Sequence, residues 1–192
     1  MKTANRTLKP YRSVSQCLLA ATIFASLSIS LAAQQPPASG PSGPDVQREA
    51  MQKLSFLVGH WSGPISVSRG PGEPVKLTQT EEIQYKLDGL VMLIEGTSRD
   101  AEGKTSFNAL ATVSFDDTTH NYRFRAYNGG HYIDTELTVT TNGFSWSYDA
   151  GPAHIVNAMH LTGKGEWSET TDVTVGGNPP HHSVEMLLQH QF

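Results

Sequence analysis

Apolar and polar side chains alternate with a period of two through most of the chain after Gly59. The segment Thr105–Phe115 is the clearest case, because every second residue from Phe107 to Phe115 is apolar. Successive side chains of a strand point to opposite faces, so this period predicts a strand with one face in a core. We expect about ten strands on this basis: His60–Arg69, Val75–Leu87, Leu90–Ser98, Thr105–Phe115, Tyr122–Tyr127, His131–Thr140, Phe144–Asp149, Ala153–Leu161, Glu166–Val175 and His182–His190.

Short turns separate the expected strands. Asn128-Gly129-Gly130 and Asn142-Gly143 are typical of tight hairpins, and no segment is long enough for a crossover helix. Hairpin connections alone favour an all-β, calycin-like, antiparallel up-and-down barrel. The rival is an open two-sheet sandwich. The two differ in whether the strand that holds Trp61 pairs with the strand that holds Leu187 and Leu188.

One segment before Gly59 has a helical period instead. Its apolar residues recur every three or four positions, which predicts a single N-terminal helix over Asp45–Leu57. These residues are Val46, Ala50, Leu54 and Leu57. Asp45 can cap this helix, and we expect Gly43 and Pro44 to stop it from extending backwards.

The first 33 residues have the order of a secretory signal peptide. Four basic residues come first, no acid occurs before Asp45, and a short apolar run leads to small residues at Ala32 and Ala33. We therefore predict cleavage between Ala32 and Gln34 and a periplasmic or extracellular product. An uncleaved membrane anchor is the alternative, but a spanning helix needs about 20 apolar residues. The Pro-, Ser- and Gly-rich segment 34–44 reads as a disordered linker, which leaves 45–192 as one barrel domain.

Charge and cysteine content exclude several classes of function. Cys17 is the single cysteine and lies in the predicted signal peptide, so the mature part has no disulfide or thiol nucleophile. Without the four basic residues of that peptide, 10 Lys and Arg face 18 Asp and Glu, a net charge of −8. An acidic surface repels phosphate backbones and anionic lipid, so we expect neither nucleic acid nor a membrane as partner.

The chain carries no common enzyme motif, which favours a non-catalytic protein over an enzyme. Adjacent acids such as Glu81 and Glu82 point to opposite strand faces, and we interpret them as solvated charges. Arg123 and Arg125 share one strand face. They could grip a carboxylate inside a lumen, but the more apolar opposite face around Phe124 favours an outward position for both.

Histidines and aromatic residues supply the candidate ligand site. Simple hairpins would place His160 opposite Trp167 and collect His60, His160 and His190 at one barrel end. We predict that any ligand contacts a group of aromatic and histidine side chains in the lumen. The group comprises Trp61, Tyr85, Trp146, His160, Trp167 and His190. Two alternatives stay open: the rings fill the barrel, or rim histidines act as acid–base groups or as metal or haem ligands.

The segment Leu54–Gly63, with Gly59, Trp61 and Gly63 at alternate positions, resembles the start of the nitrobindin-like family. It is similar as well to a related family of secreted bacterial domains with lipocalin-like or fatty-acid-binding-like barrels. Ile65 stands where that pattern has a further glycine. The resemblance implies a barrel, a lumenal ligand, and haem held by a histidine late in the chain, for which His182 and His190 are the candidates. From the sequence we thus expect an exported barrel that holds a small apolar or amphipathic molecule, with no metal site assigned.

Overall fold

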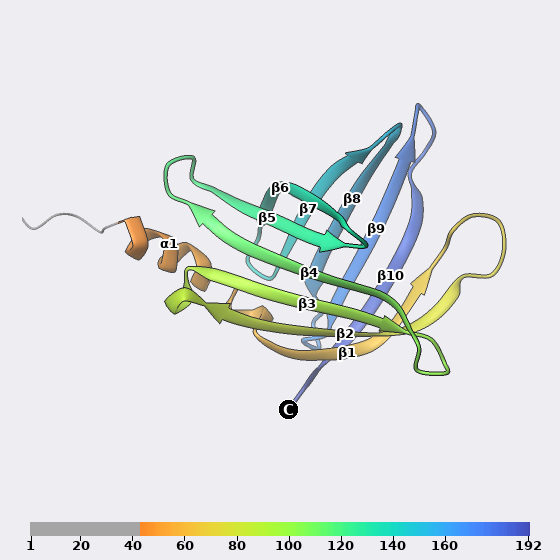
Figure 1. The fold of residues 1–192 in the computed structure, drawn as a ribbon, viewed down its shortest axis with the longest axis horizontal. Helices are drawn as coiled ribbons and strands as arrows, with labels where there is room; N and C mark the ends of the chain where they lie inside the picture. The colour runs from red at the N-terminus through yellow and green to blue at the C-terminus, as the bar shows by residue number, and fades with distance from the viewer. Residues whose placement is uncertain (1–42) are drawn as a thin grey trace, which may run out of the picture. The chain divides into compact units, whose positions relative to one another are not determined.

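Ten antiparallel strands close into a barrel in the computed structural model of the protein, which describes residues 43–192 (Figure 1). The predicted signal peptide at 1–33 and residues 34–42 of the predicted linker lie outside the described residues. The strands are β1 (Gly59–Val67), β2 (Val75–Lys86), β3 (Val91–Arg99), β4 (Thr105–Asp116), β5 (Asn121–Asn128), β6 (His131–Val139), β7 (Gly143–Ala150), β8 (Ala153–Leu161), β9 (Trp167–Val175) and β10 (His181–Gln191). Each pairs with its neighbours in sequence, as an up-and-down barrel requires.

The first and last strands close the barrel. Trp61 of β1 lies opposite His190 of β10, and Ile65 lies opposite Met186. This pairing is the one that separates a barrel from a sandwich, so the predicted all-β closed barrel with one N-terminal helix is confirmed. Closure gives every strand of residues 43–192 two neighbours, so none of these strands lies at a sheet edge.

The helix differs from its predicted bounds. α1 runs over Gly43–Gln52, and a short 3-10 helix, η1, follows at Ser55–Leu57. The expectation that Gly43 and Pro44 would stop the helix is wrong, because proline fits the first turn, where a helix needs no hydrogen bond from its N–H group. Of the predicted apolar face, Ala50, Leu54 and Leu57 are buried, whereas Val46 is only partly buried.

α1 and η1 cover one end of the barrel (Figure 1). Two tyrosines of the barrel wall donate hydrogen bonds to α1 carbonyls: Tyr85 Oη to Met51 O at 2.7 Å and Tyr122 Oη to Ala50 O at 2.7 Å. Met51 is fully buried beneath them. This end is therefore filled by side chains. No helix within residues 43–192 is long and apolar enough to cross a membrane.

Candidate functional site

The other end of the barrel opens into a cavity of about 1150 Å³. Inward-facing residues of β3, β4 and β5 that have a small side chain or none leave this space, among them Gly96, Ala111 and Ala126. On β2, β3 and β9 the residues that line it stand at alternate positions, as the period of two predicts. A volume of this size accommodates one small molecule with room for water.

Aromatic rings form much of the cavity wall. Phe124 and Trp146 lie 4.6 Å apart between ring centroids, and Tyr148 stacks on Trp146 at 5.6 Å with planes tilted by 16°. Phe144 meets Trp167 edge to face at 5.9 Å. These contacts fix the rings in place and give the wall a large apolar area.

A first acid projects into this cavity from β2. Glu81 follows Leu77 and Gln79 on the inward face, while Thr80 and Glu82 point out to solvent. Gln79 Nε2 donates to Glu81 Oε1 at 2.6 Å, and Ser98 Oγ donates to Gln79 Oε1 in turn. Burial raises the pKa of Glu81 to about 8, with repulsion from Glu169 adding to the rise and the Gln79 bond opposing it.

Gly96 on β3 makes room for this carboxyl group. It lies opposite Glu81 in the strand pairing, and a Cβ atom there would stand 2.8 Å from both carboxyl oxygens. The absence of a side chain at this position therefore lets Glu81 lie against the wall of the neighbouring strand.

A second acid faces the cavity from β9. Trp167 Nε1 donates to Glu169 Oε2 at 2.9 Å, and Trp167 itself is almost fully buried. Burial raises the pKa of Glu169 to about 7, although the Trp167 bond favours the charged form. The lumen thus contains two carboxyl groups whose neutral forms the surroundings favour.

A polar pair next to Glu169 leaves one donor free. Thr171 Oγ1 donates to Asn157 Oδ1 at 2.6 Å, and both residues line the cavity. Asn157 is only 6% exposed, and its Nδ2 atom has no hydrogen-bond partner within the described part of the chain. A buried donor without a partner is costly, so a bound molecule or water that supplies an acceptor is favoured here.

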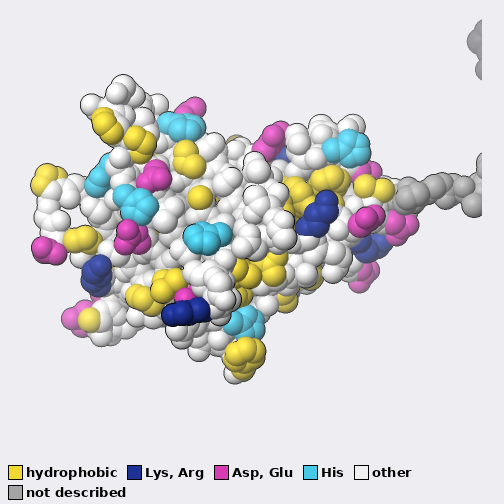
Figure 2. Space-filling view, turned by 180° about the vertical axis from the view of Figure 1, so that it is seen from behind, with side chains coloured by type: hydrophobic (Ala, Val, Ile, Leu, Met, Phe, Trp, Pro, Cys, Tyr) yellow, Lys and Arg dark blue, Asp and Glu magenta, His cyan; other side chains and the backbone are white. Residues whose placement is uncertain are grey.

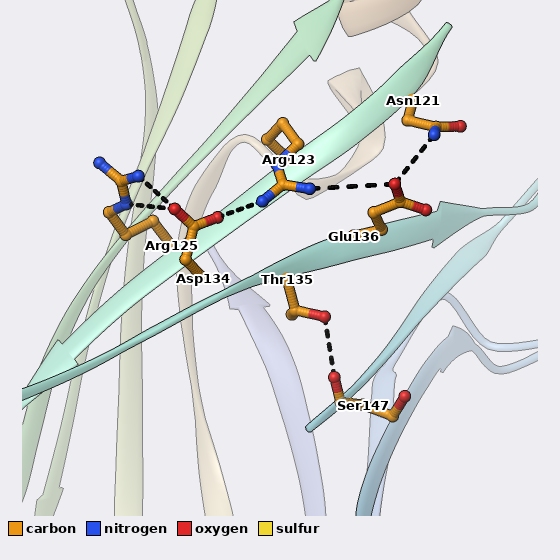
Figure 3. Close-up of polar contacts among 7 residues, drawn as sticks. All are labelled: Asn121, Arg123, Arg125, Asp134, Thr135, Glu136 and Ser147. Atoms are coloured by element: carbon orange, nitrogen blue, oxygen red, sulfur yellow. Dashed lines mark hydrogen bonds and ion pairs between the residues drawn. The ribbon is translucent and has the colours of Figure 1, made fainter. Parts of the chain in front are cut away.

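Strand pairing around the cavity is shortest between β6 and β7. Backbone pairing between these strands is confined to Leu137–Val139 and Phe144–Trp146. Closer to the open end, Thr135 Oγ1 donates to Ser147 O at 2.8 Å, a side-chain bond in place of a ladder bond (Figure 3). Consecutive residues on both strands line the cavity at this seam, which makes it a candidate portal.

The two arginines of β5 lie outside the lumen. Arg123 and Arg125 both bind Asp134 of β6 on the outer surface, and Arg123 also approaches Glu136 at 3.9 Å (Figure 3). Phe124 between them points inward and is 6% exposed. The predicted outward position is confirmed, and these guanidinium groups are not available to a ligand in the cavity.

Two of the six predicted ligand contacts, Trp146 and Trp167, line the cavity, and their binding roles stay predictions. Trp61 lies behind Trp167 at 5.8 Å between ring centroids, with its Nε1 bound to Leu57 O at 2.8 Å. Trp61 closes the helix end of the barrel together with His190, and the centroids of their rings lie 4.8 Å apart. The Tyr85 hydroxyl donates to Met51 O of α1. Neither Trp61, Tyr85 nor His190 lines the cavity.

His160 does not face the lumen. The predicted register opposite Trp167 is wrong by one residue, because Trp167 pairs with Leu161 and His160 pairs with Ser168. Inward Met159 precedes His160, so the His160 side chain points outward and is exposed. His60 is likewise exposed, so of the three histidines at this end only His190 turns inward.

Other histidines bind acids on the surface. His154 Nδ1 lies 2.7 Å from Asp149 Oδ1, and His182 lies 2.7 Å from Asp172 and 3.3 Å from Glu185. Figure 2 shows histidines spread over one face rather than gathered at a point. Within residues 43–192 no group of three or more His, Cys, Asp or Glu side chains is placed to hold a metal ion.

Sequence reasoning missed Glu81, Glu169 and Asn157. The interpretation of Glu81 as a solvated charge is wrong, because it shares its strand face with Leu77 and Ile83. That signal is present in the alternation: an acid at an apolar position of a strand faces the core. Glu169, two residues after buried Trp167, carries the same signal.

Comparison with known proteins supports the fold alone. No known protein family matches the sequence, and no curated protein matches it. Among solved structures the chain is similar to Rv2717c from M. tuberculosis, with a TM-score of 0.57 and 14% identity over 74% of this chain and 98% of that one. Similarity at this identity shows a shared barrel and leaves the ligand open.

Proposed function

We propose that the protein is a non-catalytic carrier or sensor that holds one small amphipathic molecule in the barrel lumen. The observation that carries this proposal is the open cavity, whose aromatic wall includes two groups of buried or partly buried polar side chains. β2 and β3 contribute Gln79, Glu81 and Ser98, and β8 and β9 contribute Asn157, Glu169 and Thr171. Lumenal sites with apolar walls and a few placed polar groups are typical of small-molecule binding.

The export predicted from residues 1–33 belongs to the same proposal. A carrier with its ligand enclosed in a barrel would work in the periplasm or outside the cell without needing a disulfide. The nitrobindin-like resemblance and its haem also remain predictions. The inward histidine nearest to the family's ligand position is His190, which packs against Trp61 at the filled end. The histidines that line the cavity, His131 and His154, are exposed, and His154 is bound to Asp149 at 2.7 Å.

Blocking the lumen tests the carrier proposal. We expect the neutral dye Nile red to bind the full chain saturably, with a fluorescence increase as it enters an apolar site. Ala126→Trp, which places a large ring in the cavity, is expected to weaken binding by about tenfold because it removes the space for the dye. Ala158→Trp on the exposed outer face of β8 is the matched control and should leave binding unchanged. Equal dye binding by both variants and the unmodified protein would place the site outside the lumen.

A further inference from the structure

We propose that the lumenal ligand is an organic cation, whose protonated amine is held between Glu81 and Glu169. This inference rests on the proposed lumenal binding and names its ligand class. It follows from the charges in the cavity, from the free hydrogen-bond acceptors of the two acids, and from the aromatic wall around them.

The charge distribution of the lumen favours a cation. Both acids face the inner part of the cavity, whereas the basic residues that line it, Arg69, His131 and His154, are exposed. His154 is moreover bound to Asp149 at 2.7 Å. An anionic ligand would therefore meet two acids at depth without a basic side chain to offset them, while an ammonium group meets opposite charge.

In each acid, one carboxyl oxygen accepts a hydrogen bond from the protein, and the other oxygen can accept one from a ligand. Glu81 Oε1 accepts from Gln79 at 2.6 Å, and Glu169 Oε2 accepts from Trp167 at 2.9 Å. In the described part of the chain no hydrogen bond to Glu81 Oε2 or Glu169 Oε1 is found. A primary ammonium group has three donors and no acceptor, which suits two carboxylate oxygens that β2 and β9 bring to one cavity.

Asn157 gives an independent sign that the site is built for a polar molecule. Its Oδ1 accepts from Thr171 Oγ1, and within residues 43–192 its buried Nδ2 has no hydrogen-bond partner beside the same cavity. Leaving such a donor unpaired costs stability unless a ligand or water completes it. A ligand with an acceptor atom, such as a hydroxyl or ether oxygen, would complete it.

The aromatic wall suits the body of such a ligand. Phe124, Trp146 and Trp167 line the cavity together with the two acids. Their π faces attract a cation and their area packs against an apolar chain or ring. An aryl or alkyl amine combines both requirements in one molecule.

The same arrangement links binding to pH. The other titratable side chains that line the cavity are Arg69, His131, Tyr132, Asp134, Tyr148, Asp149 and His154. All of them but Tyr148 are exposed, and His190 packs against Trp61 outside the cavity. The inward faces of the intervening strands β1 and β10 carry Ile65, Met186 and Leu188, none of which titrates. Burial raises the pKa of Glu81 to about 8 and that of Glu169 to about 7, so the anionic pair forms as pH rises through this range. Cation binding is therefore expected to strengthen over the same range.

The test uses three probes of matched shape and different charge: phenethylamine, phenethyl alcohol and hydrocinnamate. Isothermal titration of the full chain near pH 8.5 is expected to show the amine binding at least about tenfold more tightly than the alcohol, with the acid weakest. The affinity for the amine should fall between about pH 9 and about pH 6, and that for the alcohol should not. Glu81→Gln and Glu169→Gln should each weaken amine binding by about tenfold and leave alcohol binding unchanged.

Gly96→Ala provides a second variant that keeps both acids. Its methyl group would stand 2.8 Å from both Glu81 oxygens and displace that carboxyl, so amine binding should fall while Nile red still binds. Circular dichroism and thermal melts establish that each variant folds. Preference for the alcohol or the acid, or amine binding that both Gln variants retain, would overturn the cation assignment while Nile red binding upholds the carrier. Failure of Nile red and of all three probes to bind would overturn both proposals.

Discussion

At the scale of single residues, barrel closure depends on one glycine of β1. A Cβ atom at Gly63 would stand 2.1 Å from Leu187 O and 3.0 Å from Leu188 Cα, both in the backbone of β10. Unlike a side chain, this backbone cannot move away without disturbing the β1–β10 ladder that closes the barrel. The sequence motif that contains Gly63 therefore has a structural reason that is independent of any ligand.

Gly63→Ala is expected to lower the free energy of unfolding by about 3 kcal/mol, since the added methyl overpacks a backbone contact. Urea denaturation followed by tryptophan fluorescence measures this loss as a lower midpoint. Gly163→Ala is the matched control, because no atom lies within 4 Å of a Cβ built at Gly163. Identical midpoints for the two variants would contradict the close-contact explanation.

Glu81 and Glu82 show what the sequence does and does not disclose about single residues. Alternation assigns them to opposite faces, and the structure agrees: Glu82 is exposed while Glu81 faces the lumen. The partners of Glu81 could not be predicted, because Gly96 and Glu169 become its neighbours only through the register of four strand pairings. A register that is wrong by one residue, as for His160, turns a side chain to the other face.

At the scale of elements, the β6–β7 seam is the weakest part of the wall. Only three residue pairs join these strands within the described structure, whereas seven join β5 and β6. Thr135 Oγ1 holds the unpaired part through Ser147 O at 2.8 Å. Segments with few ladder bonds open at lower free energy than the rest of a fold, which suits a portal.

Hydrogen exchange tests the portal. Amides that face the seam in residues 133–136 and 147–150 are expected to exchange faster than those of the β8–β9 ladder, where nine pairs are formed. Thr135→Val removes the bridging hydroxyl and should speed exchange at the seam while lowering stability by about 1 kcal/mol. Thr138→Val, at an exposed position of β6, is the control. Uniform protection across both regions would rule out the seam as a portal.

Strands proved more predictable than the helix. β8 has the predicted bounds, Ala153–Leu161. The bounds of the other strands differ from the predicted ones by one or two residues at one end or at both. The agreement is this close because alternation and glycine turns are local signals. The helical period over Asp45–Leu57 continues through Leu54, yet α1 ends at Gln52 and the chain turns into η1. After this break Leu57 O accepts a hydrogen bond from Trp61 Nε1 at 2.8 Å, a contact that the helical period does not predict.

At the scale of the whole molecule, acids on the outer surface and acids in the lumen change the free energy of unfolding in opposite directions as pH rises. Asp134 lies outside the barrel, and hydrogen bonds from Arg125 and Arg123 lower its pKa. Backbone N–H groups of Thr118 and Thr119 lower the pKa of Asp116 in the same way. These groups favour folding in their charged form, so their contribution is lost as pH falls below the ordinary range of a carboxyl group.

The lumenal pair acts in the other direction, which gives a prediction for the whole fold. The folded pKa values of Glu81 and Glu169, about 8 and about 7, lie above the ordinary value of 4.5. The folded state therefore binds more protons than the unfolded state between these limits, and the free energy of unfolding falls as pH rises through them. Each unit of pKa difference corresponds to about 1.4 kcal/mol, or about 3–5 °C of Tm in a domain of this size, so a decrease of Tm by roughly 15–25 °C between about pH 5 and about pH 9 is expected. Thermal melts of the full chain measure it. The double variant Glu81→Gln with Glu169→Gln should lose most of this slope, because its lumenal groups no longer ionise, and an unchanged slope would mean that other groups cause the decrease.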